Sequence, residues 1–122
     1  MRYENDPRFR DYYLEDSYVL GIEETPTQVS FLLDVVLTPS HPQYLAPGPA
    51  EQHCYRPGTL MFRTVKRLEW KSRSLRKSVD ASGQVDYGNI DIFEVLPDEL
   101  FRLSGDWGEL EIVANEATLT LT

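Results

Sequence analysis

The sequence predicts a mainly β fold: a single-domain antiparallel β-sandwich or barrel of about seven or eight strands, with at most one short N-terminal helix. Three observations support this class. Apolar and polar residues alternate over several short runs, β-branched and aromatic residues are concentrated in those runs, and turn-forming residues separate them. The length of 122 residues, without a repeat or linker, favours one domain over residues 1–122.

The clearest strand is expected over residues 28–38, where Val29, Phe31, Leu33, Val35 and Leu37 share one parity. Pro39 ends this run, since proline cannot donate to a sheet ladder. The other expected strands are residues 18–22, two strands joined by a turn or bulge at residues 64–66, and residues 89–96, 100–103, 109–114 and 117–121.

The connections between these strands follow from turn chemistry. Asn5-Asp6-Pro7 is expected to cap a short helix over residues 8–13. Residues 39–58 contain five prolines and two glycines and are predicted to form a long loop, and residues 72–88 a second loop. A tight turn at Asn115-Glu116 is expected to separate the last two strands.

The charge is distributed unevenly along an acidic chain. The formal net charge is −8, yet seven of the twelve basic residues lie in residues 63–77. In the expected strand pair Arg63, Arg67 and Lys71 alternate with apolar positions such as Trp70, so they should lie on the solvent face. Periodicity therefore explains part of the basic stretch.

The rest of this stretch, Arg73, Arg76 and Lys77, has no periodic explanation. The cations of the whole stretch 63–77 could pair across strands with acids such as Glu109 and Glu111, dock an acidic partner, or bind nucleic acid. The acidic net charge disfavours nucleic acid, and the inward parity of Trp70 removes a stacking platform for bases.

The sequence contains no pattern typical of catalysis or metal binding. Cys54, His41 and His53 do not have the spacing of a zinc site, and adjacent residues in an extended strand, such as His53 and Cys54, point to opposite faces. We therefore expect no enzyme activity, no metal and no cofactor. The single cysteine and the charged first residues favour the cytoplasm, without membrane insertion.

An acidic surface is the best candidate for a binding site. Glu109 and Glu111 share the outward parity of their strand, and the preceding turn contains Asp106 and Trp107. An exposed Trp107 would be a natural anchor for a partner, although it could instead fold back over the end of the sheet. Complementary charge would favour a basic protein as the partner.

Three segments resemble small, acidic, β-rich bacterial proteins of the immunity type: residues 14–17 (LEDS), 86–91 (DYGNID) and 105–109 (GDWGE). Some proteins of that type neutralise a secreted toxin. The resemblance implies a binding role rather than catalysis, and it assigns a role to no individual residue.

The sequence thus favours a non-catalytic, macromolecule-binding protein and leaves alternatives open. A small-ligand carrier or enzyme would use a pocket lined by Phe31, Phe62, Trp70 and Phe93. Nucleic-acid binding would use residues 63–77, and two copies could pair through an uncovered strand edge.

Overall fold

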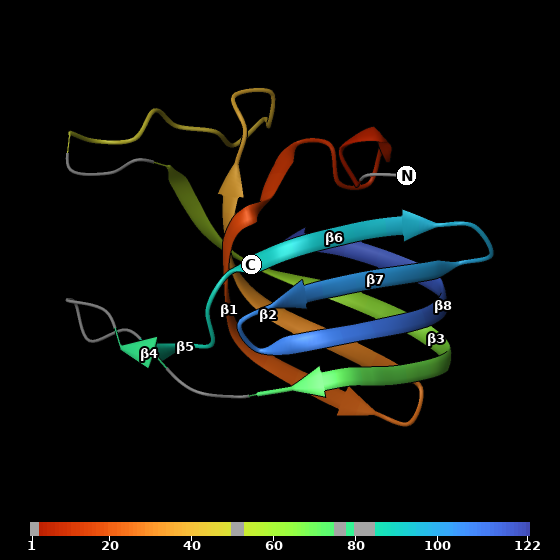
Figure 1. Ribbon diagram of the computed structural model, residues 1–122. Helices are drawn as coiled ribbons and strands as arrows, with labels where there is room; N and C mark the ends of the chain where they lie inside the picture. The colour runs from red at the N-terminus through yellow and green to blue at the C-terminus, as the bar shows by residue number, and fades with distance from the viewer. Residues whose placement is uncertain (1–2, 50–52, 75–77, 80–84) are drawn as a thin grey trace.

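The computed structural model describes residues 3–49, 53–74, 78–79 and 85–122. One six-stranded sheet dominates this part of the chain, in the order β1-β2-β3-β8-β7-β6 with every neighbouring pair antiparallel (Figure 1). The elements are η1 (Tyr3–Asn5, a 3-10 helix), β1 (Tyr12–Thr25), β2 (Gln28–Leu37), β3 (Cys54–Arg73), β4 (Ser78–Val79), β5 (Val85–Asp86), β6 (Ile90–Leu96), β7 (Leu100–Gly105) and β8 (Gly108–Leu121). The strands β4 and β5 pair only with each other.

The mainly β, antiparallel class is confirmed, and the sheet curls into a half-barrel. The predicted sandwich or barrel of about seven or eight strands is not confirmed. The two strands predicted on either side of residues 64–66 are one strand, β3, and the two predicted on either side of Asn115-Glu116 are one strand, β8. The predicted break at residues 64–66 is a register shift between Val65 and Arg67, beside Thr64 with φ 52°. A bulge bends a strand without reversing it, so β3 continues for 20 residues.

The tight turn predicted at Asn115-Glu116 is wrong. Here β8 runs on beside the bend of β3, with Glu116 opposite Arg63 and Ala114 opposite Val65. The ladder on both sides of the bend outweighs the local turn preference of these residues, because it satisfies the backbone groups of both strands.

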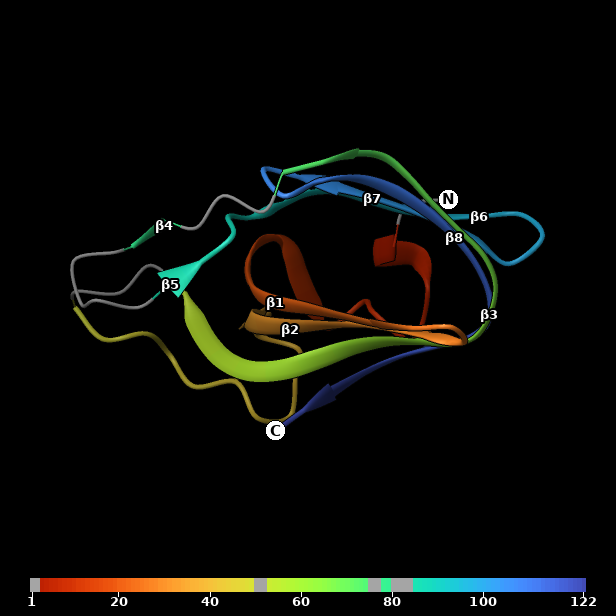
Figure 2. The ribbon, with the colours of Figure 1, turned by 90° about the horizontal axis from the view of Figure 1, so that it is seen from below.

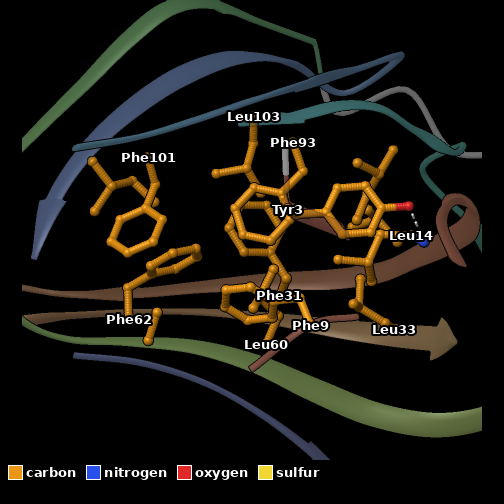
Figure 3. Close-up of a cluster of buried hydrophobic side chains, with 14 of the residues drawn as sticks. Tyr3, Phe9, Leu14, Phe31, Leu33, Leu60, Phe62, Phe93, Phe101 and Leu103 are labelled. Atoms are coloured by element: carbon orange, nitrogen blue, oxygen red, sulfur yellow. Dashed lines mark hydrogen bonds between the residues drawn. The ribbon is translucent and has the colours of Figure 1, made fainter. Parts of the chain in front are cut away.

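This shared bend folds the sheet over its own core. In Figure 2, β3 and β8 curve around one side of the molecule, with β1 and β2 on one side of the interior and β6 and β7 on the other. Phe62 lies at the bend with its ring 6.2 Å from Phe31 of β2, 5.0 Å from Phe101 of β7 and 6.3 Å from Phe93 of β6 (Figure 3). Burial of these rings holds the two halves together.

The N-terminal segment closes part of the open side of this core. Tyr3, Phe9 and Leu14 are fully buried, and both aromatic rings contact Phe93, at 5.7 Å and 5.1 Å between centroids. The Leu14 N–H donates to the Tyr3 hydroxyl (3.1 Å; Figure 3). The segment thereby supplies core side chains that the curled sheet lacks between β1 and β6.

The helix predicted over residues 8–13 is wrong. Asp6 does cap a turn, since its carboxylate accepts from the Arg8 N–H at 2.9 Å and its carbonyl from the Arg10 N–H at 3.1 Å. The turn stops there, because Tyr12 already pairs with Leu37 in the β1–β2 ladder. Strand pairing of two β-forming tyrosines outweighs helix propagation after a single turn.

The proline-rich loop is shorter than the predicted residues 39–58. Strand β3 begins at Cys54, so Pro57 and Gly58 lie inside it, opposite Asp34 and Leu33 of β2. Pro57 donates no hydrogen bond, but its carbonyl accepts from the Thr122 N–H at 2.9 Å. Pro57 is thus tolerated in the ladder because only its carbonyl oxygen takes part in a hydrogen bond there.

The edge strand β1 hydrogen-bonds with residues 87–89, which directly precede the other edge strand, β6. Tyr18 forms an isolated bridge with Asn89, Val19 N–H donates to Gly88 O at 2.9 Å, and Tyr87 N–H donates to Val19 O at 2.8 Å. Pairing of two copies through a strand edge remains a prediction.

Gly105 allows the closest packing in the described structure. A Cβ built there would lie 2.1 Å from the carbonyl oxygen of Asn89 and 2.5 Å from Nε1 of Trp107. Gly105→Ala should therefore lower the free energy of unfolding by roughly 1–3 kcal/mol through overpacking. Urea unfolding followed by tryptophan fluorescence measures this.

Gly48→Ala is the matched control, because a Cβ at Gly48 has nothing within 4 Å. It should change the free energy of unfolding by no more than about 0.5 kcal/mol. Equal unfolding midpoints for the two variants would contradict the close packing at Gly105.

Candidate functional site

The outer face of β3, β6, β7 and β8 carries a ladder of paired charges. Arg102 contacts Glu94 and Glu111, at 3.2 Å each, and Lys71 contacts Glu111 at 3.5 Å and Glu69 at 3.0 Å. The hydrogen bond from Arg102, and then the charge of Lys71, hold the pKa of Glu111 below its ordinary value. The charge of Glu111 is therefore balanced within the sheet.

The other members of the predicted acidic surface lie near this ladder but do not join it. Glu109 and Asp106 are exposed, and neither forms an ion pair with another described residue. The side chain of Asp106 lies against Gly88, where an added Cβ would come within 2.6 Å of its carboxylate oxygen. Exposed, solvated carboxylates of this kind add little binding energy by themselves.

Trp107 is not an exposed anchor, and the alternative in which it folds back over the end of the sheet is confirmed. Its side chain is fully buried, and its indole N–H donates to Asn89 O at 3.1 Å. The ring packs edge-on against Phe31 at 5.3 Å and Trp70 at 6.0 Å. The two-residue turn between Gly105 and Gly108, the latter with φ 131°, directs the indole inward, so it folds back over the core.

The basic stretch is partly neutralised by the fold. Arg73 stacks on the ring of Trp70 with 4.5 Å from Cζ to the centroid, and its Nη1 lies 3.1 Å from Glu24 of β1. Lys66 lies 3.8 Å from Glu99. As the alternation predicts, Arg63, Arg67 and Lys71 are exposed. Arg76 and Lys77 lie outside the described residues.

A different surface combines aromatic rings with two carboxylates, one of which has no ion-pair partner among the described residues. It covers the outer side of β1, β2 and the start of β3, and we call it the tyrosine face: Tyr13, Asp16, Tyr18, Asp34, His53 and Tyr55. Four of its rings form a row, with centroid distances of 6.1 Å from Tyr13 to His53, 5.8 Å from His53 to Tyr55, and 5.9 Å from Tyr55 to Tyr18.

An irregularity in β1 gives this row its register. The pairing of β1 with β2 shifts between Tyr13 and Tyr18, and Ser17 fills the interruption. The Ser17 hydroxyl donates to the Tyr13 carbonyl at 2.9 Å and accepts from the Val36 N–H at 3.0 Å. Tyr18 is thereby placed directly opposite Asp34.

Asp34 is the unusual charge of this face. It is half-buried, burial raises the pKa of its carboxyl, and it forms no ion pair with another described residue. Its register neighbour on β3 is Pro57, while Arg56 pairs with the core residue Val35 and so lies on the opposite face of the sheet. A carboxylate that is partly removed from water without a cation costs free energy.

Tyr55, beside Asp34, remains a protonated hydrogen-bonding group. The pKa of Tyr55 is raised to about 12, first by burial and then by Tyr18, through its charge and its hydrogen bond, and by the charges of Asp16 and Asp34. Nε2 of His53 lies 3.0 Å from the Asp16 carboxylate. Together these groups form an acidic surface with rigid aromatic rings.

A cavity of about 290 Å³ adjoins the tyrosine face. Its lining residues are Tyr13, Val36, Leu37, Thr38, Pro39, Tyr44, His53 and Cys54. Cys54 is buried, whereas Tyr13 is 39% exposed, so an apolar floor lies beside an accessible ring. A second cavity, of about 310 Å³, lies between β1 and β6 and is lined by Glu15, Asp91, Ile92, Phe93 and Glu94.

No group of three or more His, Cys, Asp or Glu side chains in the described ranges could hold a metal ion. Nor does any helix within those ranges have the length and apolar character needed to cross a membrane. Comparison of the chain with protein-family models, curated proteins and solved structures gives no match. The functional argument therefore depends on the residues of this chain.

Sequence reasoning missed the tyrosine face, although one signal pointed to it. Asp34 lies on the same parity as Leu32 and Val36, and Val36 is only 2% exposed. A carboxylate on a partly covered strand face costs free energy unless a cation or hydrogen-bond donor contacts it. The residues that surround Asp34 come from other strands, so the alternation within β2 could not identify them.

Replacement of Asp34 by asparagine should leave the fold as stable as before or more stable at pH 7. Burial raises the pKa of the Asp34 carboxyl, so the folded chain binds its proton more readily than the unfolded chain does. The ionised carboxylate therefore lowers the free energy of unfolding at pH values above its folded pKa. This cost disappears below about pH 4, where the carboxyl is protonated in both states. We expect Asp34→Asn to gain up to about 1 kcal/mol at pH 7, after allowance for solvent screening, and the gain to disappear by pH 3.5.

Urea unfolding of both proteins at pH 7 and pH 3.5 measures the difference. Asp16→Asn is the control, because that carboxylate is exposed and contacts His53, and its loss should bring no gain at pH 7. Lower stability of Asp34→Asn at pH 7 would show that the carboxylate stabilises the free protein.

Proposed function

We propose that this chain is a non-catalytic, immunity-like protein that binds a basic protein partner through the tyrosine face. The observation that carries the proposal is Asp34, a half-buried carboxylate with no ion-pair partner in the described chain, placed beside the rings of Tyr18 and Tyr55. A partner cation would restore the interactions that this carboxylate lost when the chain folded.

The composition of the face supports an interface. Tyrosine supplies large contact area with few rotatable bonds and is enriched among the residues that dominate binding energy. Asp16 and Asp34 add negative charge within the ring row, and the formal net charge of −8 would speed the encounter with a basic protein. The adjoining cavity could receive an apolar side chain of the same partner.

The surface around Glu109 and Glu111 is a weaker candidate. Glu111 already accepts from Arg102 and Lys71, so a partner would have to compete with existing ion pairs. Trp107 is buried and offers no contact. The same reasoning weakens nucleic-acid binding by residues 63–77, because Lys71 and Arg73 contact carboxylates of this chain.

A small-ligand carrier is the second candidate function, and the cavity beside Tyr13 and Cys54 favours it. Its volume of about 290 Å³ is close to the lower end of the range for ligand sites. The pocket expected from Phe31 and Phe62 is a different place, and these two rings are fully buried in the core.

Partner capture with matched variants tests the leading proposal. The chain is immobilised in an extract of the cells that produce it, at low salt and at about 0.5 M salt, where exposed charge contacts are screened. We expect a basic protein that binds at low salt. With this protein purified, the double variant Asp16→Asn/Asp34→Asn should weaken binding at least about tenfold, or about 1.4 kcal/mol.

Glu109→Gln is the control for a general loss of negative charge, since Glu109 is exposed and lies on the other outer face. It should leave the dissociation constant within about twofold. Equal losses for the control and the double variant would overturn the assignment to the tyrosine face. Capture of no protein in either salt would turn attention to a small ligand in the cavity.

A further inference from the structure

The described part of the chain uses one arrangement of three groups twice: an arginine, an aromatic ring and a carboxylate. In the first, the guanidinium of Arg73 stacks on Trp70 at 4.5 Å and contacts Glu24 at 3.1 Å, while the Trp70 indole donates to the same carboxylate at 2.9 Å. An arginine thus combines a ring contact with an ion pair, and it joins β3 to β1.

The second arrangement lies at the N-terminal segment. Cζ of Arg8 is 5.1 Å from the ring centroid of Phe9 and 5.5 Å from that of Phe101. The same guanidinium donates from Nε at 2.9 Å and from Nη2 at 2.7 Å to the two carboxylate oxygens of Asp6. Asp6 is 6% exposed, and the hydrogen bond from Arg8 is the main cause of its lowered pKa.

The tyrosine face contains two of these three groups. The rings of Tyr18 and Tyr55 lie 5.9 Å apart and are tilted by 34°, and the Asp34 carboxylate stands in direct register with Tyr18. The third group, a cation, is not supplied by any residue in the described ranges. Arg56 lies on the opposite face, and Arg63 pairs with Gln28, six residues along β2 from Asp34.

We propose that the partner supplies the third group as an arginine side chain, which contacts Asp34 and stacks beside Tyr18 and Tyr55. This inference rests on the proposed function for its biological meaning. The charge of the site excludes an acidic occupant, and its rings favour a flat cation over a compact one.

Arginine suits this position better than lysine for three physical reasons. Its planar guanidinium stacks on aromatic rings, it forms two parallel hydrogen bonds with one carboxylate, and it loses less hydration than an ammonium when it is partly buried. The pKa of Tyr55 is raised to about 12, so its hydroxyl is neutral at physiological pH and accepts a hydrogen bond without adding a second charge.

The site can be tested on the full chain without the partner. The probes are N-acetyl-arginine amide and N-acetyl-lysine amide, which carry the same charge on similar backbones. Each is titrated into isotopically labelled protein, and the backbone and tyrosine-ring resonances are followed by NMR. We expect saturable shifts for arginine centred on Tyr18, Asp34 and Tyr55, with a dissociation constant of about 1–10 mM.

The lysine probe should bind at least about threefold more weakly at this place. Asp34→Asn should remove the saturable shifts, and Tyr18→Leu should reduce the preference for arginine over lysine, with far-UV circular dichroism to check that each variant is folded. Glu109→Gln is the matched control and should leave the shifts unchanged. Equal binding of the two probes, shifts spread over all exposed carboxylates, or unchanged binding by Asp34→Asn would overturn the inference.

This experiment fails separately from the test of the proposed function. If partner binding depends on Asp16 and Asp34 but the arginine probe shows no preference for the site, the arginine inference is wrong and the proposed function stands. If the arginine probe selects Asp34 but no basic protein depends on the face, the site stands and the proposed function is wrong.

Discussion

The rest of the structure depends on the bend that β3 and β8 share. A register shift after Val65 bends β3, and β8 bends with it because the two strands stay paired on both sides of the shift. The sheet then closes over Phe62, whose ring contacts Phe31 on one side of the core and Phe93 and Phe101 on the other. Hydrophobic burial at this place converts one curled sheet into two opposed halves with two distinct outer faces.

Those two faces treat charge in opposite ways. On one, Arg102 stands between Glu94 and Glu111 in the cross-strand register, and each of these three charges has an opposite neighbour. On the other, Asp34 faces Tyr18 and Pro57, neither of which carries a charge. Because both faces are built on the same sheet, the fold does not require this difference. A neutral residue at Asp34 would satisfy the same alternation.

The limits of sequence reasoning in this chain have a physical origin. Alternation predicted β2 because the period-two pattern is local and the strand has one strongly buried parity. It left a turn or a bulge open at residues 64–66, where the structure has the bulge, and it wrongly placed a turn at Asn115-Glu116. A bulge and a turn use similar residues, and only the partner strand decides between them. The direction of Trp107 depends on Asn89 and Phe31, which are distant in sequence.

The candidate site shows the same limit more strongly. Pairing of basic residues with Glu111 was predictable, because both parities could be read from their own strands, and Lys71 does contact it. Asp34 becomes part of a candidate site because Tyr18 of β1 and Tyr55 of β3 lie beside it. The position of Tyr18 depends in turn on the register shift in β1 that Ser17 fills. No pattern within β2 contains that information.

The energetic argument for binding follows from this arrangement. The free protein bears the cost of a half-buried carboxylate whose pKa is raised by burial alone. Elsewhere in the chain the comparable carboxylates Asp6 and Glu111 are held by arginine, and their pKa values are lowered. A partner cation at Asp34 would lower this raised pKa, so complex formation at a pH near the pKa of the free protein should release protons from Asp34. A cationic partner would thus offset the free energy that the folded protein loses by burying the Asp34 carboxylate, whereas a neutral partner would not.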